Sequence, residues 1–200
     1  MFRWISCLVA LVLSATLSQA AGDARAQEVV ELLAGRFRAM KAYTVIFEVQ
    51  GADFATEGSY AVEGDRYYMR VGDAEAYSDG ESKWEIDPVK REVVVDVVDR
   101  SSRSLLNNPT RAFDFLGDAF VSELLPSENG LYRLQLTPAD KGAVMSAVTV
   151  EVAADGTPHA VVYDLDGDTL RIDIRRIASS ADVKRFDAGA YPGYETIDFR

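Results

Sequence analysis

The residues that could carry catalysis or hold a metal ion are few in this chain of 200 residues. His159 is the only histidine, and a single imidazole provides neither a metal cluster nor a catalytic triad, so we interpret it as a structural or surface residue. The acidic run from Asp164 to Asp168 resembles the start of a calcium-binding loop, but Arg175 stands where such a loop needs a glutamate. A hairpin turn explains this run better. We therefore expect no metal ion and no cofactor.

Acidic residues also gather around one predicted turn, and a pair of carboxylates at a suitable separation is the machinery of glycoside hydrolysis. Their spacing places them on the polar side of two strands, which is typical of a solvated face. We expect that the protein is not an enzyme, and hydrolysis of an envelope polymer stays open as the least favoured alternative. The acidic residues are Asp79, Glu81, Glu85 and Asp87.

Residues 1–20 have the composition of a cleavable signal peptide. They contain one basic residue, Arg3, an apolar stretch from Ile5 to Leu17 and a small-residue ending at Ala20. We therefore expect an exported protein whose residues 21–200 form a single domain. The only cysteine, Cys7, lies in this leader, so we expect a mature domain without disulfide bonds or cysteine metal ligands.

The net charge of −11 at pH 7 argues against one class of partner. Lysine and arginine contacts to phosphate supply most of the affinity for nucleic acids, so we expect no nucleic-acid partner. The excess of acidic residues also predicts good solubility and repulsion from anionic membrane surfaces.

Apolar residues first follow a helical period and then a strand period. From Gln27 to Met40 they recur every three or four positions, which predicts an amphipathic helix with one apolar face. From Tyr43 to Gln50 apolar and polar residues alternate, which predicts a strand that is buried on one side.

Turn sequences rich in Gly, Asn and Asp then separate short alternating runs. Successive hairpins of this kind produce a meandering antiparallel sheet, and a sheet this long must curl or close. We predict a mainly β fold with helices, of the α+β class, in which the sheet forms a barrel or half-barrel. The predicted strands lie near residues 57–63, 66–71, 82–87, 92–98, 131–137, 147–152, 159–164 and 168–176.

A second helical stretch interrupts this series of strands at residues 107–121. Asn108 is suited to the N-cap and Pro109 to the first helical position. The stretch is unusually rich in phenylalanine for a segment outside the sheet. We expect it, together with the first helix, to cover the mouth or the concave face of the sheet.

The string from Ser78 to Pro88, S-D-G-x-x-x-W-x-x-D-P, resembles LolA-type outer-membrane lipoprotein carriers. The order of the other motifs is similar across nearly the whole mature chain. Before this string come an F-x-x-Q strand (Phe47–Gln50), an E-G strand (Glu57–Gly58) and an aromatic strand (Tyr67–Met69), and after it come the Asn-Pro helix, L-Q-L-T-P (Leu134–Pro138), D-G-T (Asp155–Thr157) and K-R-F-D (Lys184–Asp187).

This resemblance implies an incomplete, strongly curved antiparallel β half-barrel whose helices form a lid over an apolar cavity. It also implies a periplasmic chaperone that binds the acyl chains of lipoproteins and shuttles them from the inner to the outer membrane. The implied partners are a LolCDE-type inner-membrane exporter and an outer-membrane acceptor, LolB-like or of another kind, and we expect a monomer. The main alternative is a regulatory module of the envelope that senses a lipid or a lipoprotein with the same half-barrel.

The cavity and lid residues follow from the alternation of the strands and from the matched positions. Tyr67 and Met69 fall where LolA-type carriers place residues that face the cavity. The competing interpretation is that all of these positions are ordinary core residues. The predicted lipid-binding cavity consists of Val45, Phe47, Tyr67, Met69, Trp84 and Ile86, and the predicted lid residues are Phe113, Leu116 and Phe120.

The sequence departs from the family pattern at one place. Many LolA-type carriers have a basic residue followed by proline just before the aromatic strand, and the arginine ties the lid to helix backbone. Glu63 and Gly64 stand at these positions here, and an ionised carboxylate cannot donate those hydrogen bonds. Arg66 and Arg103 are the candidate substitutes.

Overall fold

The computed structural model describes residues 24–102, 104–113, 119–140, 147–165 and 168–200. The predicted signal peptide at residues 1–20 lies outside these ranges. No helix within them is both long enough and apolar enough to cross a membrane.

A helix over residues 24–38 comes first, and its burial follows the predicted helical period. Ala26, Val30 and Leu33 are buried, whereas Glu28 and Glu31 are exposed. The strands that follow are β1 (Ala42–Gln50), β2 (Ala55–Glu63), β3 (Arg66–Val71), β4 (Ala74–Ser78), β5 (Ser82–Asp87), β6 (Glu92–Val97), β7 (Phe120–Glu128), β8 (Leu131–Pro138), β9 (Ala147–Val152), β10 (Pro158–Leu165), β11 (Asp168–Ala178) and β12 (Glu195–Asp198).

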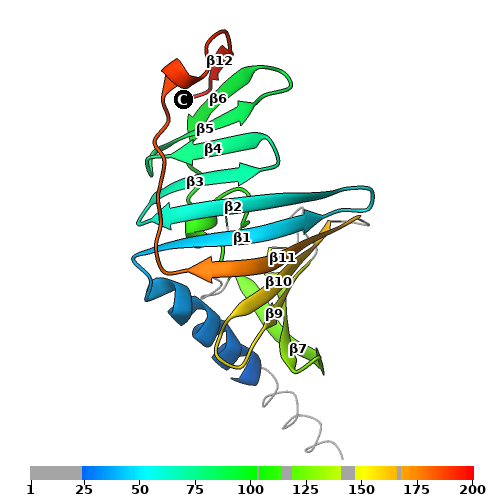
Figure 1. Ribbon diagram of the computed structural model, residues 1–200. Coiled ribbons are helices and arrows are strands. Elements are labelled where there is room, and N and C mark those ends of the chain that lie inside the picture. The colour runs from blue at the N-terminus through cyan, green and yellow to red at the C-terminus, as the bar shows by residue number, and fades with distance from the viewer. Residues whose placement is uncertain (1–23, 103, 114–118, 141–146, 166–167) are drawn as a thin grey trace, which may run out of the picture.

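The strands form one sheet in the order β12-β6-β5-β4-β3-β2-β1-β11-β10-β9-β8-β7 (Figure 1). The chain starts in the middle of the sheet at β1, builds one side as far as β6, crosses to the far edge at β7 and returns to β1 through β11. Neighbouring strands are antiparallel, except that β12 runs parallel to β6. In the described residues β12 and β7 each have one neighbour, so the sheet stays open, and the predicted half-barrel is confirmed.

The inner face of the sheet is the face that the helix covers. Val45, Phe47 and Val49 of β1 point to it and are almost completely buried, whereas Ile46 points outward and is exposed. Gly58 lies opposite Phe47 in the register of β1 and β2, and a Cβ atom at this position would come within 2.4 Å of the Phe47 ring. The glycine of the E-G strand therefore makes room for an aromatic ring of the core.

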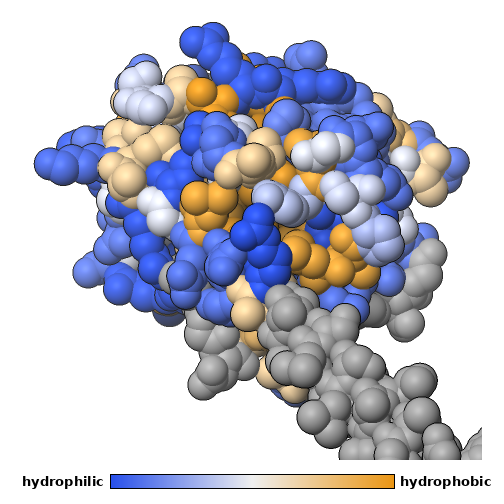
Figure 2. All heavy atoms as spheres, turned by 90° about the horizontal axis from the view of Figure 1, so that it is seen from below, coloured by the Kyte–Doolittle hydropathy of each residue, from blue (hydrophilic) through white to orange (hydrophobic). Residues whose placement is uncertain are grey.

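Buried side chains of the helix, the inner face and the segment after β6 form one cluster, which we call the interior cluster. It spans both halves of the sheet, since it includes Tyr60 of β2 and Leu134 of β8. Hydrophilic residues surround most of it, although patches of apolar residues show on the face seen from below (Figure 2).

The outer face of β3–β6 is covered by residues 179–194, which we call the C-terminal strap. The strap leaves the end of β11 and crosses the strands toward β12 (Figure 1). Its Phe186 stacks on Trp84 with ring centroids 5.2 Å apart. Glu75 of β4 accepts hydrogen bonds from the hydroxyl groups of Tyr68, Tyr77 and, in the strap, Tyr191. Burial opposes ionisation of Glu75, but these hydrogen bonds outweigh it and hold the pKa of the carboxyl below its usual range.

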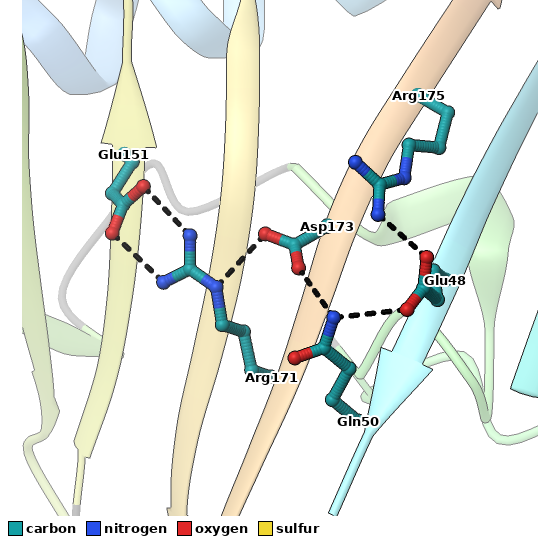
Figure 3. Close-up of polar contacts among 6 residues, drawn as sticks. All are labelled: Glu48, Gln50, Glu151, Arg171, Asp173 and Arg175. Carbon is teal, nitrogen blue, oxygen red and sulfur yellow. Dashed lines mark hydrogen bonds and ion pairs between the residues drawn. The ribbon is translucent and has the colours of Figure 1, made fainter. Parts of the chain in front are cut away.

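The outer face of the other half of the sheet carries a network of paired charges (Figure 3). Arg171 reaches across β10 and donates two hydrogen bonds to Glu151, at 2.9 and 3.0 Å, and a third to Asp173 at 2.8 Å. Gln50 joins Asp173 to Glu48, which also pairs with Arg175. The charges on this face are thus paired within the chain.

The predicted second helix at residues 107–121 is only partly present. Asn108 and Pro109 begin a helical turn as predicted, but it is the short 3-10 helix η1 (Pro109–Arg111). The prediction was wrong at its other end, because Phe120 and Val121 pair with Pro138 and Thr137 as the first residues of β7. Phe120 and Val121 therefore belong to a strand at the edge of the sheet and not to a helix. Residues 114–118 lie outside the described ranges.

Replacing Glu75 with glutamine should lower the free energy of unfolding by about 1–2 kcal/mol, because the neutral amide accepts weaker hydrogen bonds than the carboxylate. The folded-state pKa of Glu75 is depressed, so its stabilisation is present at neutral pH and is lost as the pH falls through that value. Urea unfolding should therefore show the largest difference at pH 7 and convergence of the two proteins near pH 3.

The matched control is Glu57→Gln, since Glu57 is exposed on β2. This change should alter the free energy of unfolding by less than about 0.5 kcal/mol at either pH. Equal effects of the two substitutions would show that the carboxylate of Glu75 does not hold the strap.

Candidate ligand-binding cavity

A cavity of about 640 Å³ opens where the C-terminal end of the helix meets the segment that follows β6. We call this segment, residues 98–102 and 104–113, the covering segment. The cavity has an apolar wall and a rim of polar and charged side chains. The apolar wall consists of Phe37, Met40, Tyr43, Val62, Val98 and Phe113.

The wall is apolar because three regular elements bring their buried faces to it. Phe37 belongs to the apolar face of the helix, and Tyr43 and Val62 face each other in the register of β1 and β2. Phe113 of the covering segment stacks on Phe37 with ring centroids 4.2 Å apart and planes 22° apart. The rings of Tyr43 and Phe37 pack edge to face, with their centroids 5.2 Å apart. Half of the wall residues are therefore aromatic, and their rings offer a large and tolerant contact area.

Tyrosine hydroxyl groups hold the covering segment to the sheet. The hydroxyl of Tyr43 donates to the carbonyl of Pro109 at 3.2 Å, and the amide of Leu105 donates to the hydroxyl of Tyr163 at 3.0 Å. Burial raises the pKa of both phenols, so they are neutral at physiological pH and able to act in this way. No pattern in the sequence indicated that these tyrosines would fix the segment.

Of the two arginines proposed to close the lid, Arg66 lies within the described residues. Arg66 forms an ion pair with Glu63, the residue that stands in place of the family's basic residue. Arg103 lies outside the described ranges. Within the described residues, the Phe37–Phe113 stack and the two tyrosine hydrogen bonds help to hold the covering segment over the cavity.

The structure brings together four of the predicted cavity residues. Val45 and Phe47 of β1 and Tyr67 and Met69 of β3 all lie on the inner face and belong to the interior cluster. They are buried beside the cavity and are not among the residues that line it. Burial raises the pKa of Tyr67 to about 12, which is consistent with its place inside this cluster.

Trp84 and Ile86 lie on the opposite face of the sheet from these four residues. The register pairs Trp84 with Tyr77 and places Ile86 against Glu75, so both point to the outer face beneath the C-terminal strap. Trp84 there borders a smaller cavity of about 340 Å³ together with Phe186. The predicted set of six is therefore divided between two faces.

The predicted lid residues have three different outcomes. Phe113 lines the cavity and is 2% exposed. Phe120 is half-buried at the start of β7 and packs against the interior cluster. Leu116 lies outside the described ranges. Among the described residues no cluster of His, Cys, Asp or Glu has the geometry of a metal site.

Tyr60 has a buried hydroxyl group without a hydrogen-bond partner among the described residues. Its ring lies in the interior cluster, 6.1 Å from the Tyr43 ring and 5.9 Å from the Phe47 ring. Desolvation raises the pKa of this phenol well above its ordinary value. A buried donor of this kind costs stability, so the interior is not the best-packed core that these residues could form.

The chain was compared with protein families, curated proteins and solved structures. No family and no curated protein matches it. Its structure is similar to that of an uncharacterized conserved protein from Thermus thermophilus, at 10% identity and a TM-score of 0.52, with 87% of this chain and 99% of that chain covered. A MucB structure matches at 14% identity and a TM-score of 0.50, with 86% and 64% covered.

A LolA superfamily protein, NE2245 from Nitrosomonas europaea, is also found, at 12% identity and a TM-score of 0.40, with 83% of this chain and 96% of that chain covered. At these identities the likenesses concern the fold alone. The open and curved half-barrel that the motifs predicted is confirmed.

Two tyrosine-to-phenylalanine substitutions should have opposite effects on the free energy of unfolding. Tyr163→Phe leaves the amide of Leu105 without its acceptor and should lower stability by about 1–3 kcal/mol. Tyr60→Phe removes an unpartnered hydroxyl and should raise stability by up to about 1 kcal/mol. Urea unfolding of both variants against the unmodified protein measures the difference, and a loss of stability of the same size in both would contradict the hydrogen-bond assignment.

Proposed function

We propose that this protein, which has the fold of LolA-type proteins, is a periplasmic chaperone that binds the acyl chains of lipoproteins and shuttles them from the inner to the outer membrane. The observation that carries the proposal is the cavity of about 640 Å³ with its aromatic wall at the open end of the curved sheet. Cavities of about 300–1,000 Å³ with mostly apolar walls are typical of small-molecule sites.

The size of the hydrophobic effect explains why such a cavity is needed. Each buried methylene group contributes about 0.8 kcal/mol, so a chain of sixteen carbons contributes on the order of 12 kcal/mol that water cannot supply. A carrier must offer apolar surface of its own while the chain crosses an aqueous compartment. The wall formed by Phe37, Tyr43 and Phe113 provides such a surface.

Release requires that the cover opens at a modest cost. The covering segment is held by the Phe37–Phe113 stack, by the burial of Leu105 and Ala112 in the interior cluster, and by hydrogen bonds that include those of Tyr43, Tyr163 and Arg100. Aromatic pairs contribute about 0.5–1.5 kcal/mol beyond their buried area, and ordinary hydrogen bonds contribute a similar net amount. These values suit a cover that moves aside to admit the cargo.

The proposal includes the partners that a shuttle needs. A LolCDE-type inner-membrane exporter would load the cargo, and an outer-membrane acceptor would receive it. A sensor with the same half-barrel would bind the same chains but would remain in a stable complex with a membrane partner. An envelope hydrolase would release products from a polymer and would not retain acyl chains.

Replacing Ala34 with phenylalanine tests whether the cavity holds acyl chains. Ala34 is 1% exposed and lines the cavity, so a benzyl group at this position would occupy part of the space. The variant should bind a C16 acyl probe, whose fluorescence rises in apolar surroundings, about tenfold more weakly, a loss of about 1.4 kcal/mol. A fluorescence titration of the purified mature protein measures the dissociation constant.

The matched control is Ala39→Phe. Ala39 follows the helix, is exposed and does not line the cavity. This variant should bind the probe as the unmodified protein does. If the unmodified protein does not bind the probe, or if Ala34→Phe binds it with unchanged affinity, the cavity is not an acyl-chain site.

A further inference from the structure

The rim of the cavity is basic, although the protein as a whole is acidic. The chain has 21 basic and 32 acidic residues. Among the described residues that line the cavity, Asp65 is the one acid, whereas Arg38, Lys41, Arg100 and Arg111 are basic. A local excess of positive charge at the mouth of an apolar cavity contrasts with the overall composition and indicates a negatively charged ligand group.

Two of these rim cations have no carboxylate partner among the described residues. Lys41 is exposed just after the helix, and Arg100 follows β6. Neither forms an ion pair within those ranges. Some arginines elsewhere form ion pairs within the chain, such as Arg171 with Glu151 and Arg175 with Glu48 (Figure 3).

Backbone contacts hold Arg100 at the rim. Its Nη2 donates to the carbonyl of Gly80 at 2.8 Å, and its own carbonyl accepts a hydrogen bond from Nη1 of Arg111 at 3.0 Å. A guanidinium has five N–H donors, and this contact uses one of the two terminal nitrogens. The charge of Arg100 is thus fixed at the mouth while further donors are available to a ligand.

We propose that the cavity selects acyl chains whose attached polar group is anionic. The acyl chain lies against Phe37, Tyr43 and Phe113, and the anionic head lies at the rim near Lys41 and Arg100. This inference rests on the proposed function and adds the chemistry of the head to that of the tail. Free phosphate lacks the apolar part that the wall recognises.

If the rim residues had only a structural role, their substitution would have a different effect from the one that ligand binding predicts. Arg38 is the last residue of the helix, where a cation is favourable beside the helix C-terminus. A purely structural role would change stability on substitution and would leave the preference between lipid heads unchanged. The experiment below therefore substitutes Lys41 and Arg100 and measures preference as well as stability.

The test compares two lipids with the same C16 chain, lysophosphatidylglycerol with an anionic head and lysophosphatidylcholine with a zwitterionic head. Both are added below their micelle concentrations to the mature protein, and displacement of a fluorescent C16 probe is measured. The anionic lipid should bind at least about fivefold more tightly, a preference of about 1 kcal/mol. The preference should diminish as salt rises from about 50 to about 500 mM, because salt screens charges at the rim.

The double variant Lys41→Gln/Arg100→Gln should lose this preference and keep its affinity for lysophosphatidylcholine within about twofold. The control Arg70→Gln/Lys90→Gln removes two exposed cations outside the cavity and should keep the preference. Urea unfolding checks that each variant is folded, and Lys41→Gln alone, which leaves the Arg100 contacts intact, should halve the preference if the double variant is unstable.

The outcomes separate the inference from the proposed function. Equal binding of the two lipids by the unmodified protein overturns the anionic-head inference and leaves an acyl-chain site. Binding of neither lipid overturns both. Competition by glycerol 3-phosphate at millimolar concentration would assign the rim to a free phosphate compound and would overturn the lipid as its ligand.

Discussion

The stacking of Phe37 on Phe113 is the contact on which the rest of the site depends. It joins the end of the helix to the covering segment, and it lies above Tyr43, the first inward-facing residue of β1. The open sheet exposes an apolar inner face that two separate pieces of chain must cover. Where the two pieces meet, they leave a cavity, and the contact between them is a pair of rings and not a continuous element.

The two faces of the sheet differ in how their polar groups are paired. On the outer face the polar groups are paired: Arg171 forms ion pairs with Glu151 and Asp173. Glu75 accepts hydrogen bonds from three tyrosine hydroxyls, of which that of Tyr191 belongs to the strap. Among the described residues, the inner face contains the buried hydroxyl of Tyr60 without a hydrogen-bond partner, and the cavity rim has Lys41 and Arg100 without a carboxylate partner. In our proposal this difference between the faces arises because the inner face meets a ligand.

The sequence predicted helices and strands well where the buried residues follow one period, either that of a helix or that of a strand. The helix, β1 and most hairpins follow from the spacing of apolar and turn residues alone. The glycine of the E-G strand is explained by Phe47, whose ring leaves no room for a side chain at Gly58. The short strands β4 and β12 and the edge strand β7 were not predicted. β7 replaced the end of a predicted helix because Phe120 and Val121 fit either period and the pairing with β8 decided between them.

The site was less predictable because it depends on which face each strand presents. A change of one residue in a turn moves every following side chain to the other face, so the side of Trp84 and Ile86 could not be inferred from alternation. The contacts of Tyr163 with Leu105 and of Arg100 with Gly80 join residues far apart in the sequence, and no local pattern marks them. Among the predicted lid residues that the structure describes, Phe113 is the one that lines the cavity.

The central claim is that hydrocarbon chains occupy the cavity when the protein is in its native compartment. The most direct measurement is native mass spectrometry of the mature protein purified from that compartment without detergent, followed by lipid extraction. The account predicts protein carrying acyl-containing species that dissociate on unfolding. Recovery of the protein in a single mass equal to that of the bare polypeptide, with no acyl chains in the extract, would contradict it.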